Sequence, residues 1–263
     1  MNELRASLCS GPQLGLCYMY PAPGVIERIA PDWDWVWVDG QHGELGYADV
    51  LAAVRACNLS LRPAIVRVPG HDAGAIGKAL DTLADGLMVP MVDTADQARA
   101  IVQAAKFPPL GSRSFGGRRP IDRLGRSYAH ADIEQPLLIC QIETPMGLQN
   151  VDEIAAVEGV DALFFGPDDM RLRAGLPMDQ PLPVGYFDEA LHTVIQAAQK
   201  HRKFAGGVFG APQSLVQAVE LGYRLIVATG DVMLLSQGST NKATEMREAL
   251  GNKKGAAGID SPY

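Results

Sequence analysis

Acidic, basic and amide side chains stand at the ends of several apolar segments of this 263-residue chain. Glu143 closes the run LLICQIE, and Asp169 follows the run ALFFGPD. Carboxylates without neighbouring His or Cys ligands suit a hard divalent cation such as Mg²⁺ or Mn²⁺. The alternatives are that each carboxylate caps the helix expected just beyond it, or that the pair shares one proton.

Two further side chains are candidates for proton transfer and anion binding. Arg67 ends the apolar segment RPAIVR, where burying a guanidinium without an anion would be unfavourable. We therefore expect Arg67 to face an anionic ligand or a carboxylate, the alternative being a structural pair with an acidic strand end. His42 follows Asp39 by three residues. A carboxylate that fixes its tautomer would make His42 a proton carrier, whereas a polar surface histidine is the simpler interpretation.

These residues can meet only if the apolar segments that carry them lie side by side. Most of these segments are continuous rather than alternating, as is typical of strands covered on both faces, and helical patterns separate them. They span residues 14–20, 33–40, 62–69, 86–92, 137–143, 162–168, 204–210 and 225–231. The pattern predicts an α/β fold, a single-domain parallel (β/α)₈ TIM barrel over residues 1–250 with a flexible tail at 251–263. An open doubly wound sheet is the alternative, although no GxGxxG follows the first segment.

In such a barrel the carboxyl ends of the strands converge on one mouth. Glu143 and Asp169 end consecutive strands, which lie about 4.8 Å apart, so they could hold one ion between them. Trp33, Trp35 and Trp37 alternate along the second segment, and we expect them to pack between the sheet and the helices. Thr94-x-x-Gln97 predicts a capping box at a helix start.

Composition and charge exclude several classes of partner. The chain is 47% hydrophobic and 20% charged, with a net charge of −7, which disfavours nucleic acid. No apolar run approaches the roughly 18 residues of a membrane span, and the N-terminal residues lack a signal-peptide pattern. The four cysteines form no CxxC motif, so we expect reduced thiols in a cytoplasmic protein.

One connection is much longer than barrel connections usually are. Residues 106–136 are rich in Gly, Pro and Arg, and such loops are usually functional or interfacial. The arginines could bind an anion or a neighbouring subunit, and a solvated or interfacial cluster is the simpler interpretation. They are Arg113, Arg118, Arg119, Arg123 and Arg126.

The chain resembles the HpcH/HpaI aldolase family of metal-dependent (class II) pyruvate aldolases over about residues 10–250. The stretches that carry the resemblance are DWVWVDGQHGE, PAIVRVP, LMVPMVDTADQA, KFPPLGSRSFG, QIETPMGLQNVDEIAAVEGVDALFFGPDDM and G(x)₅ATGD(x)₂LL. The resemblance implies a (β/α)₈ barrel and a homohexamer built as a trimer of dimers. It also implies reversible cleavage of a 4-hydroxy-2-oxo acid to pyruvate and an aldehyde, through a pyruvate enolate stabilised by Mg²⁺, Mn²⁺ or Co²⁺.

Carried over residue by residue, the resemblance makes Glu143 and Asp169 the metal ligands. Arg67 would contact the carbonyl or enolate oxygen of pyruvate, and Gln141 would lie beside the ligands. The backbone of Gly166-Pro167-Asp168 would lie near the pyruvate carboxylate.

The resemblance also assigns the proton transfer and a contact between subunits. His42 with Asp39 would move the proton, and Asp81 matches an acid that enters a neighbouring subunit's site. The chain departs from the family pattern at Asp168, which adds a charge beside Asp169. Arg171 and Arg173 stand where small polar residues are more usual, which could change the electrostatics of the acceptor side.

The residues themselves disfavour one aldolase mechanism. A Schiff-base aldolase needs a lysine inside the barrel, and none of the eight strand segments contains a lysine. Related enolate chemistry remains as an alternative, either oxaloacetate decarboxylation or cleavage of a malyl- or citramalyl-CoA thioester. A non-catalytic binding barrel is the alternative outside enzymes.

Overall fold

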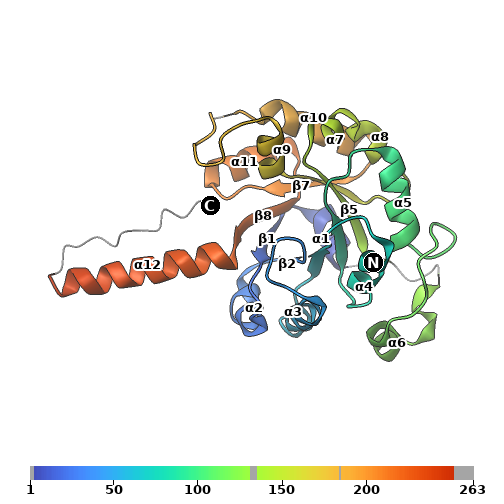
Figure 1. The fold of residues 1–263 in the computed structure, drawn as a ribbon, viewed down its shortest axis with the longest axis horizontal. Helices are drawn as coiled ribbons and strands as arrows, with labels where there is room; N and C mark the ends of the chain where they lie inside the picture. Colours follow the sequence, from blue (N-terminus) through green and yellow to red (C-terminus); the bar gives the residue numbers. More distant parts are fainter. Residues whose placement is uncertain (1–2, 131–134, 184, 252–263) are drawn as a thin grey trace.

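The computed structural model describes residues 3–130, 135–183 and 185–251, and its core is a closed barrel of eight parallel strands (Figure 1). Neighbouring strands pair in sequence order and β8 pairs with β1. The strands are β1 (Gln13–Tyr18), β2 (Trp35–Asp39), β3 (Ala64–Arg67), β4 (Gly86–Val89), β5 (Leu137–Ile142), β6 (Ala162–Phe165), β7 (Phe204–Val208) and β8 (Leu225–Gly230). The predicted (β/α)₈ barrel is confirmed, and the open sheet is wrong. The predicted tail lies outside the described residues except for Gly251.

The helices of the described chain are α1 (Glu3–Ser10), α2 (Pro23–Ile29), α3 (Tyr47–Leu59), α4 (Ala73–Leu80), α5 (Ala95–Ala105), α6 (Arg118–Leu124), α7 (Pro145–Gln149), α8 (Val151–Ala155), α9 (Pro167–Arg173), α10 (Asp188–Lys200), α11 (Pro212–Leu221) and α12 (Asp231–Ala249). Helices α2 to α11 lie in the connections between successive strands, whereas α1 precedes β1 and α12 follows β8. The capping box predicted for α5 is confirmed, since Thr94 Oγ1 accepts from the Gln97 N–H at 3.2 Å and Gln97 Oε1 accepts from the Thr94 N–H at 3.1 Å.

Alternate residues along each strand face two separate hydrophobic layers. The outer layer joins strands to helices, and Trp33 packs against it. The inner layer fills the barrel, and it includes Trp35 and Trp37 together with Leu4 and Leu8 of α1, which close its amino end. The prediction that all three tryptophans lie in the outer layer is therefore wrong for Trp35 and Trp37.

A glycine gives the inner tryptophan Trp35 its space. Gly15 of β1 is the register partner of Trp35, and a Cβ at Gly15 would lie 2.2 Å from Trp35 Cε2. A side chain on β1 would therefore displace the indole. The ring instead lies across the strand pair, where its N–H donates to the Gln13 carbonyl at 3.1 Å.

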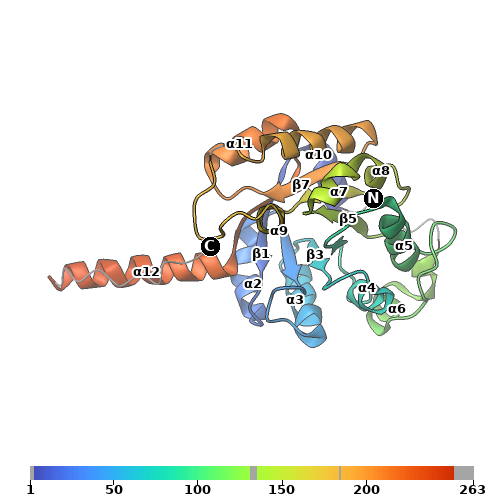
Figure 2. The same ribbon diagram turned by 45° about the horizontal axis from the view of Figure 1, so that its top comes forward.

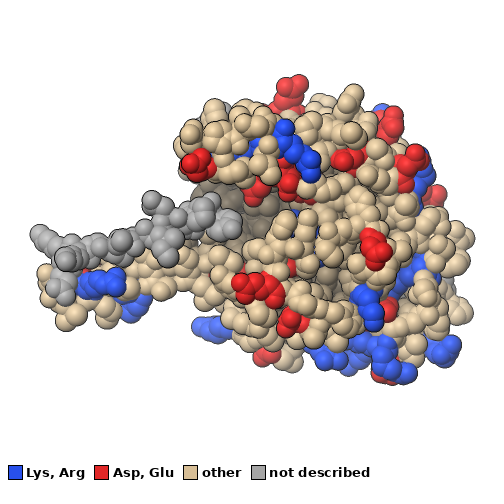
Figure 3. Space-filling view, in the orientation of Figure 1, with Lys and Arg blue, Asp and Glu red and all other residues tan. Residues whose placement is uncertain are grey.

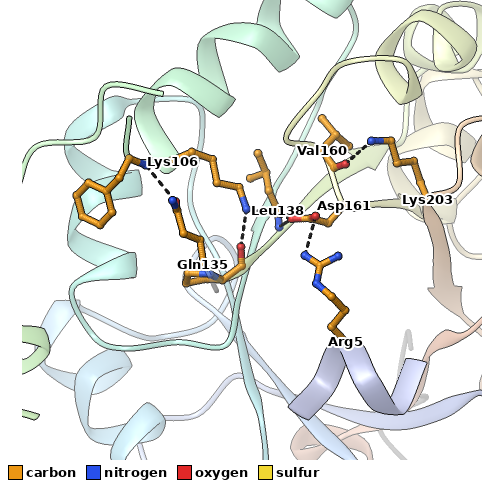
Figure 4. Close-up of polar contacts among 9 residues, drawn as sticks. Arg5, Lys106, Gln135, Leu138, Val160, Asp161 and Lys203 are labelled. Atoms are coloured by element: carbon orange, nitrogen blue, oxygen red, sulfur yellow. Dashed lines mark hydrogen bonds and ion pairs between the residues drawn. The ribbon is translucent and has the colours of Figure 1, made fainter. Parts of the chain in front are cut away.

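Asp161 organises a polar cluster at the amino end of the barrel (Figure 4). Its carboxylate accepts from Arg5 Nη2 at 2.7 Å, from Lys106 Nζ at 3.1 Å and from the Leu138 N–H at 2.7 Å. Lys106 also donates to the Pro136 carbonyl at 2.7 Å. One carboxylate thus ties α1 and the end of α5 to β5.

Asp161→Ala is expected to lower the free energy of unfolding by about 3 kcal/mol, because the variant removes the acceptor shared by two cations and a backbone N–H. Urea unfolding followed by circular dichroism measures the change. Asp152→Ala is the matched control, because Asp152 also binds two basic side chains, Lys200 and His201, but its side chain is 51% exposed. The control should lose less than about 1 kcal/mol. Equal losses in the two variants would contradict the role given to Asp161.

Helix α12 projects away from the barrel in both ribbon views (Figures 1 and 2). Its first residue is anchored, because the buried Asp231 carboxylate accepts from the Met19 and Tyr20 N–H groups at 3.0–3.1 Å. From Leu235 to the helix end, every residue except Ala243 is exposed. None of the described helices combines the length and apolarity needed to cross a membrane.

Candidate active site

Four buried polar side chains meet at the carboxyl end of the barrel. Asp39 ends β2, Arg67 ends β3, and Gln141 and Glu143 come from the end of β5 and the residue just beyond it. Their exposed fractions are 1%, 7%, 3% and 3%. Because alternate residues share a face of the strand, these side chains emerge on the same side as the inner layer, above Trp37. The mouth is where barrels of this type place their chemistry.

Arg67 is held by two planar hydrogen bonds to Asp39, its register partner on β2. Nε donates to Oδ1 at 2.8 Å and Nη2 donates to Oδ2 at 2.6 Å. The third nitrogen, Nη1, lies 3.4 Å from Gln141 Oε1. Arg67 therefore faces a carboxylate, as expected from the unfavourable burial of an unpaired guanidinium. The pair holds one edge of the guanidinium and leaves Nη1 directed toward β5.

Glu143 lies beside this pair without capping a helix. Its Oε1 accepts from the Met91 N–H at 2.8 Å, whereas α7 is capped by Thr144 Oγ1, which accepts from the Gly147 N–H at 2.9 Å. Burial raises the pKa of Glu143 from 4.5 to about 7, the Met91 N–H and Arg67 oppose that rise, and Asp169 adds to it. The helix-cap alternative is therefore wrong for Glu143.

Asp169 lies in the first turn of α9, where it is partly buried and interacts electrostatically with Glu143. The N-cap residue of α9 is Gly166, which has no side chain that could cap the helix. A Cβ at Gly166 would lie 2.6 Å from Glu143 Oε2 and 2.8 Å from Gln141 Nε2. Glycine thus lets α9 start against both side chains. Asp169 stands inside the first turn of α9 rather than at its N-cap, so the cap alternative is wrong for Asp169 as well.

The segment Gly166-Pro167-Asp168, which is expected near the pyruvate carboxylate, offers one free backbone N–H group rather than three. The Gly166 N–H donates to the Ile142 carbonyl at 3.0 Å, and Pro167 has no N–H. Asp168 is exposed and stands in the first turn of α9, where backbone N–H groups have no partner within the helix. Only the Asp168 N–H of this segment is available to an anion.

His42 and Asp39 are connected differently from the sequence-based expectation. The Asp39 carboxylate accepts from the backbone N–H groups of Gln41 and His42 at 3.1 and 3.3 Å. In the described part of the chain, its contacts include no hydrogen bond to the His42 ring, and His42 is exposed. Asp39 therefore shapes the loop that carries His42 and orients Arg67, but it does not fix the tautomer of His42.

Asp81 is not part of this cluster. It is the C-cap residue of α4, which runs back from the mouth after β3, and its Oδ1 accepts from Arg113 Nη2 at 3.0 Å. A Cβ at Gly117 would lie 2.6 Å from the Asp81 carboxyl carbon. Asp81 therefore belongs to the contact between α4 and the long connection, remote from Glu143 of the same chain.

The arginines of the long connection are largely engaged within the chain, and Lys and Arg gather over this region in Figure 3. Arg113 is buried over the Phe107 ring at 4.7 Å. Arg119 donates to the Thr82 carbonyl at 2.5 Å and to Asn58 Oδ1 at 2.6 Å. Arg118 pairs with Asp122. These contacts give the cluster a structural role and lend no support to an anion site.

The two arginines of α9 have different surroundings. Arg171 Nη2 donates to the carbonyls of Pro177 and Gln180 and so holds the loop after α9. Arg173 Nη2 lies 3.6 Å from Met91 Sδ and opposes the rise in the pKa of Glu143. Only Arg173 therefore bears on the electrostatics of the mouth.

Met91 is a site residue that the sequence did not reveal. Its φ of 54° lies in the left-handed region, which is uncommon for a residue with a side chain. This conformation accompanies the turn in which its N–H meets Glu143. Sequence offered no signal, because a backbone donor leaves no trace in residue type.

Comparison with known proteins gives a consistent result. Residues 25–237 match the HpcH/HpaI aldolase/citrate lyase family. The chain is 36% identical to a 4-hydroxy-2-oxovalerate aldolase of Novosphingobium aromaticivorans, over 97% of this chain and 98% of that protein. It is 32% identical to a hydroxypyruvate/pyruvate aldolase of Sagittula stellata, over 93% of this chain and 97% of that protein. The fold is similar to the crystal structure of an HpcH/HpaI aldolase/citrate lyase family protein from Burkholderia cenocepacia, with a TM-score of 0.85 and 29% sequence identity. The similarity covers 94% of this chain and 100% of that chain. The chain therefore belongs to the HpcH/HpaI aldolase/citrate lyase family of carbon–carbon lyases.

Proposed function

We propose that the protein is a divalent-metal-dependent aldolase that reversibly cleaves a 4-hydroxy-2-oxo acid to pyruvate and an aldehyde. The observation that carries the proposal is the buried cluster at the mouth, in which an oriented guanidinium and a buried carboxylate lie close together. Kinship with aldolases of such substrates supports the same reaction.

Glu143 and Asp169 would hold the cation, which we propose to be Mg²⁺, Mn²⁺ or Co²⁺. Two carboxylates placed together, one of them buried with a raised pKa, favour a compensating positive charge. No group of three or more His, Cys, Asp or Glu side chains in the described residues is arranged to hold a metal. A pair suffices for Mg²⁺, which keeps several waters and leaves room for substrate oxygens. When bound, the cation supplies positive charge where negative charge develops on the keto acid.

Arg67 would stabilise the same developing charge from the side of the protein. Cleavage leaves an enolate on pyruvate, and Nη1 of Arg67 is directed toward Gln141, two residues before Glu143. Asp39 holds the guanidinium with two bonds, so little reorganisation is needed during the reaction. Gln141 accepts from Nη1 before substrate enters, and the Asp168 N–H would bind the pyruvate carboxylate.

His42 would carry the proton. It lies on the loop after β2, exposed to solvent, and its position is set by the bond between its N–H and Asp39. In cleavage it would take the proton of the aldol hydroxyl, directly or through one water, and in the reverse direction it would return that proton to the acceptor aldehyde.

The assay that tests the proposal measures pyruvate release from 4-hydroxy-2-oxo acids of different tail length and charge, with Mg²⁺, Mn²⁺ or Co²⁺ and with EDTA. Release that EDTA abolishes supports the aldolase. Pyruvate formed from oxaloacetate alone would assign a decarboxylase, and release from CoA thioesters alone would assign a thioester lyase. Absence of both pyruvate release and metal binding would leave a non-catalytic barrel.

We infer that the protein acts in the cytoplasm on small molecules as a homo-oligomer, a hexamer arranged as a trimer of dimers. All four cysteines are free, which favours a reducing compartment. Helix α12 exposes Leu235 and Met246 at 50% and 45%, and its C-cap residue Leu250 is 77% exposed; a second copy would cover these side chains. Asp81, remote from the mouth of its own chain, would reach the site of a neighbour.

Deleting residues 237–263, which removes most of α12, is expected to reduce the molar mass in solution to that of a smaller assembly. The expectation follows because the exposed apolar side chains Met246 and Leu250 are lost. Light scattering coupled to size exclusion measures the mass. Deleting only residues 252–263 is the control, and it should leave the number of subunits per assembly unchanged, with each subunit lighter by those 12 residues. A full-length chain that is monomeric at micromolar concentration would refute the assembly.

A further inference from the structure

Trp37 lies directly beneath the guanidinium of Arg67. Arg67 Cζ is 4.5 Å from the centroid of the Trp37 ring, and Trp37 is 5% exposed. Trp37 also packs against Phe164 in an edge-to-face arrangement, with ring centroids 5.5 Å apart and planes inclined by 72°. The arginine on which the proposed chemistry depends therefore rests on an aromatic face.

We propose that Trp37 is a positioning residue, which acts on the reaction by fixing the plane of the Arg67 guanidinium. The proposal rests on the proposed function and deepens it. Asp39 and Gln141 bind the edges of the guanidinium, and hydrogen bonds in its plane do not prevent the group from tilting out of that plane. The Trp37 ring blocks this tilt from below and attracts the cation, an interaction that strengthens where water is excluded.

The indole of Trp37 has a feature that packing alone does not explain. Its Nε1 is buried without a hydrogen-bond partner in the described part of the chain. Trp35, two residues earlier and equally inward, does have a partner for its N–H, the Gln13 carbonyl. A buried unpaired N–H is unfavourable, and an aliphatic side chain would fill the interior without it. The ring is therefore explained by its contact with Arg67 rather than by its volume.

The test compares variants that distinguish the effect of the aromatic face of Trp37 from the effect of the volume that its side chain fills. Trp37→Met fills much of the space without an aromatic face, and Trp37→Phe keeps a smaller face. We expect kcat for the cleavage to fall about 10-fold in Trp37→Met, which corresponds to about 1.4 kcal/mol, and to stay within about 3-fold in Trp37→Phe. The matched control is Phe164→Met, which replaces the neighbouring ring of the same layer with the same side chain and should stay within about 3-fold.

A binding measurement accompanies the rates. Oxalate, a planar dianion that resembles the pyruvate enolate, is titrated calorimetrically into the Mg²⁺-loaded protein, and its affinity should fall in Trp37→Met but not in Phe164→Met. Equal kcat in the two Trp37 variants, or equal losses in Trp37→Met and Phe164→Met, would overturn the proposal. A natural chain without aldolase activity would instead overturn the proposed function, so the two failures are distinguishable.

Discussion

The Glu143→Gln variant is expected to release pyruvate about 1,000-fold more slowly than the natural chain, because a neutral amide is a poor ligand for a hard cation and metal-ion catalysis contributes several kcal/mol. Gln keeps the size of Glu and retains an oxygen for the Met91 N–H. Steady-state kinetics against Mg²⁺ concentration should show that saturating metal does not restore the rate. Turnover close to that of the natural chain would remove Glu143 from the proposed metal site.

The same variant is expected to gain stability at pH 8 in EDTA. With a pKa near 7 in the fold and near 4.5 when unfolded, Glu143 binds more protons in the folded chain between these pH values. The free energy of unfolding of the natural chain therefore falls as the pH rises through this window, by up to about 3 kcal/mol. Urea unfolding at pH 5 and pH 8 measures the difference, which Glu143→Gln should reduce. Burial also raises the pKa of Asp85, and its contribution stays in the variant.

Glu153→Gln is the matched control for both measurements, because Glu153 is an exposed residue of α8. It should change neither the rate nor the pH dependence of unfolding. If Glu143→Gln lost activity and stability together, the loss of activity would have to be attributed to misfolding rather than to the missing carboxylate.

Arg67→Lys is expected to slow the exchange of the pyruvate methyl protons with solvent about 100-fold or more, the usual effect of removing a donor from an oxyanion site. Lysine keeps the positive charge that compensates the buried Asp39. An ammonium, however, cannot donate two coplanar hydrogen bonds to the Asp39 carboxylate, and it cannot stack on the Trp37 ring as a planar guanidinium does. Proton NMR in D₂O with Mg²⁺ measures the exchange.

The metal affinity of the Arg67→Lys variant should stay within about 3-fold of the natural value, because Arg67 is not a ligand. Arg28→Lys, on the exposed surface of α2, is the control and should leave the exchange rate unchanged. Normal exchange in Arg67→Lys would exclude Arg67 from enolate stabilisation.

The barrel and its mouth could be predicted because both follow from repeating patterns. Each expected strand segment coincides with one observed strand, although β1 begins one residue before its segment, and polar residues that end neighbouring strands meet, as Arg67 meets Asp39. A buried guanidinium needs an anion, and a carboxylate at the end of the neighbouring strand satisfies that need. Such predictions depend only on strand order and on the energy of buried charge.

The orientation of Trp37 follows from two facts that the sequence itself contains. Trp37 and Asp39 are two residues apart on one strand, so they share a face. A functional Asp39 at the mouth requires that face to be the inner one, which excludes the layer under the helices. Alternation alone does not show which residues of the strand face the barrel interior and which face the helices. One polar residue whose direction is known, such as Asp39, decides between the two faces.

Other parts of the site could not be predicted from the sequence. The Met91 N–H and the spacing between Gly166 and Glu143 are properties of the backbone path, which residue types do not encode. Asp39 accepts a hydrogen bond from the backbone N–H of His42 and not from the imidazole ring, and this depends on how the loop turns after β2. Asp81 lies at the far end of α4, and its proposed role needs another copy of the chain.

Helix α1 closes one end of the barrel, because Leu4 and Leu8 fill its amino end in the described structure. Substrate would therefore enter, and products would leave, through the mouth. In the proposed reaction, pyruvate bound to Arg67 would lie deeper than the aldehyde, so the aldehyde would leave first and pyruvate last. Pyruvate would then compete with fresh substrate for the emptied enzyme, whereas the aldehyde would inhibit noncompetitively.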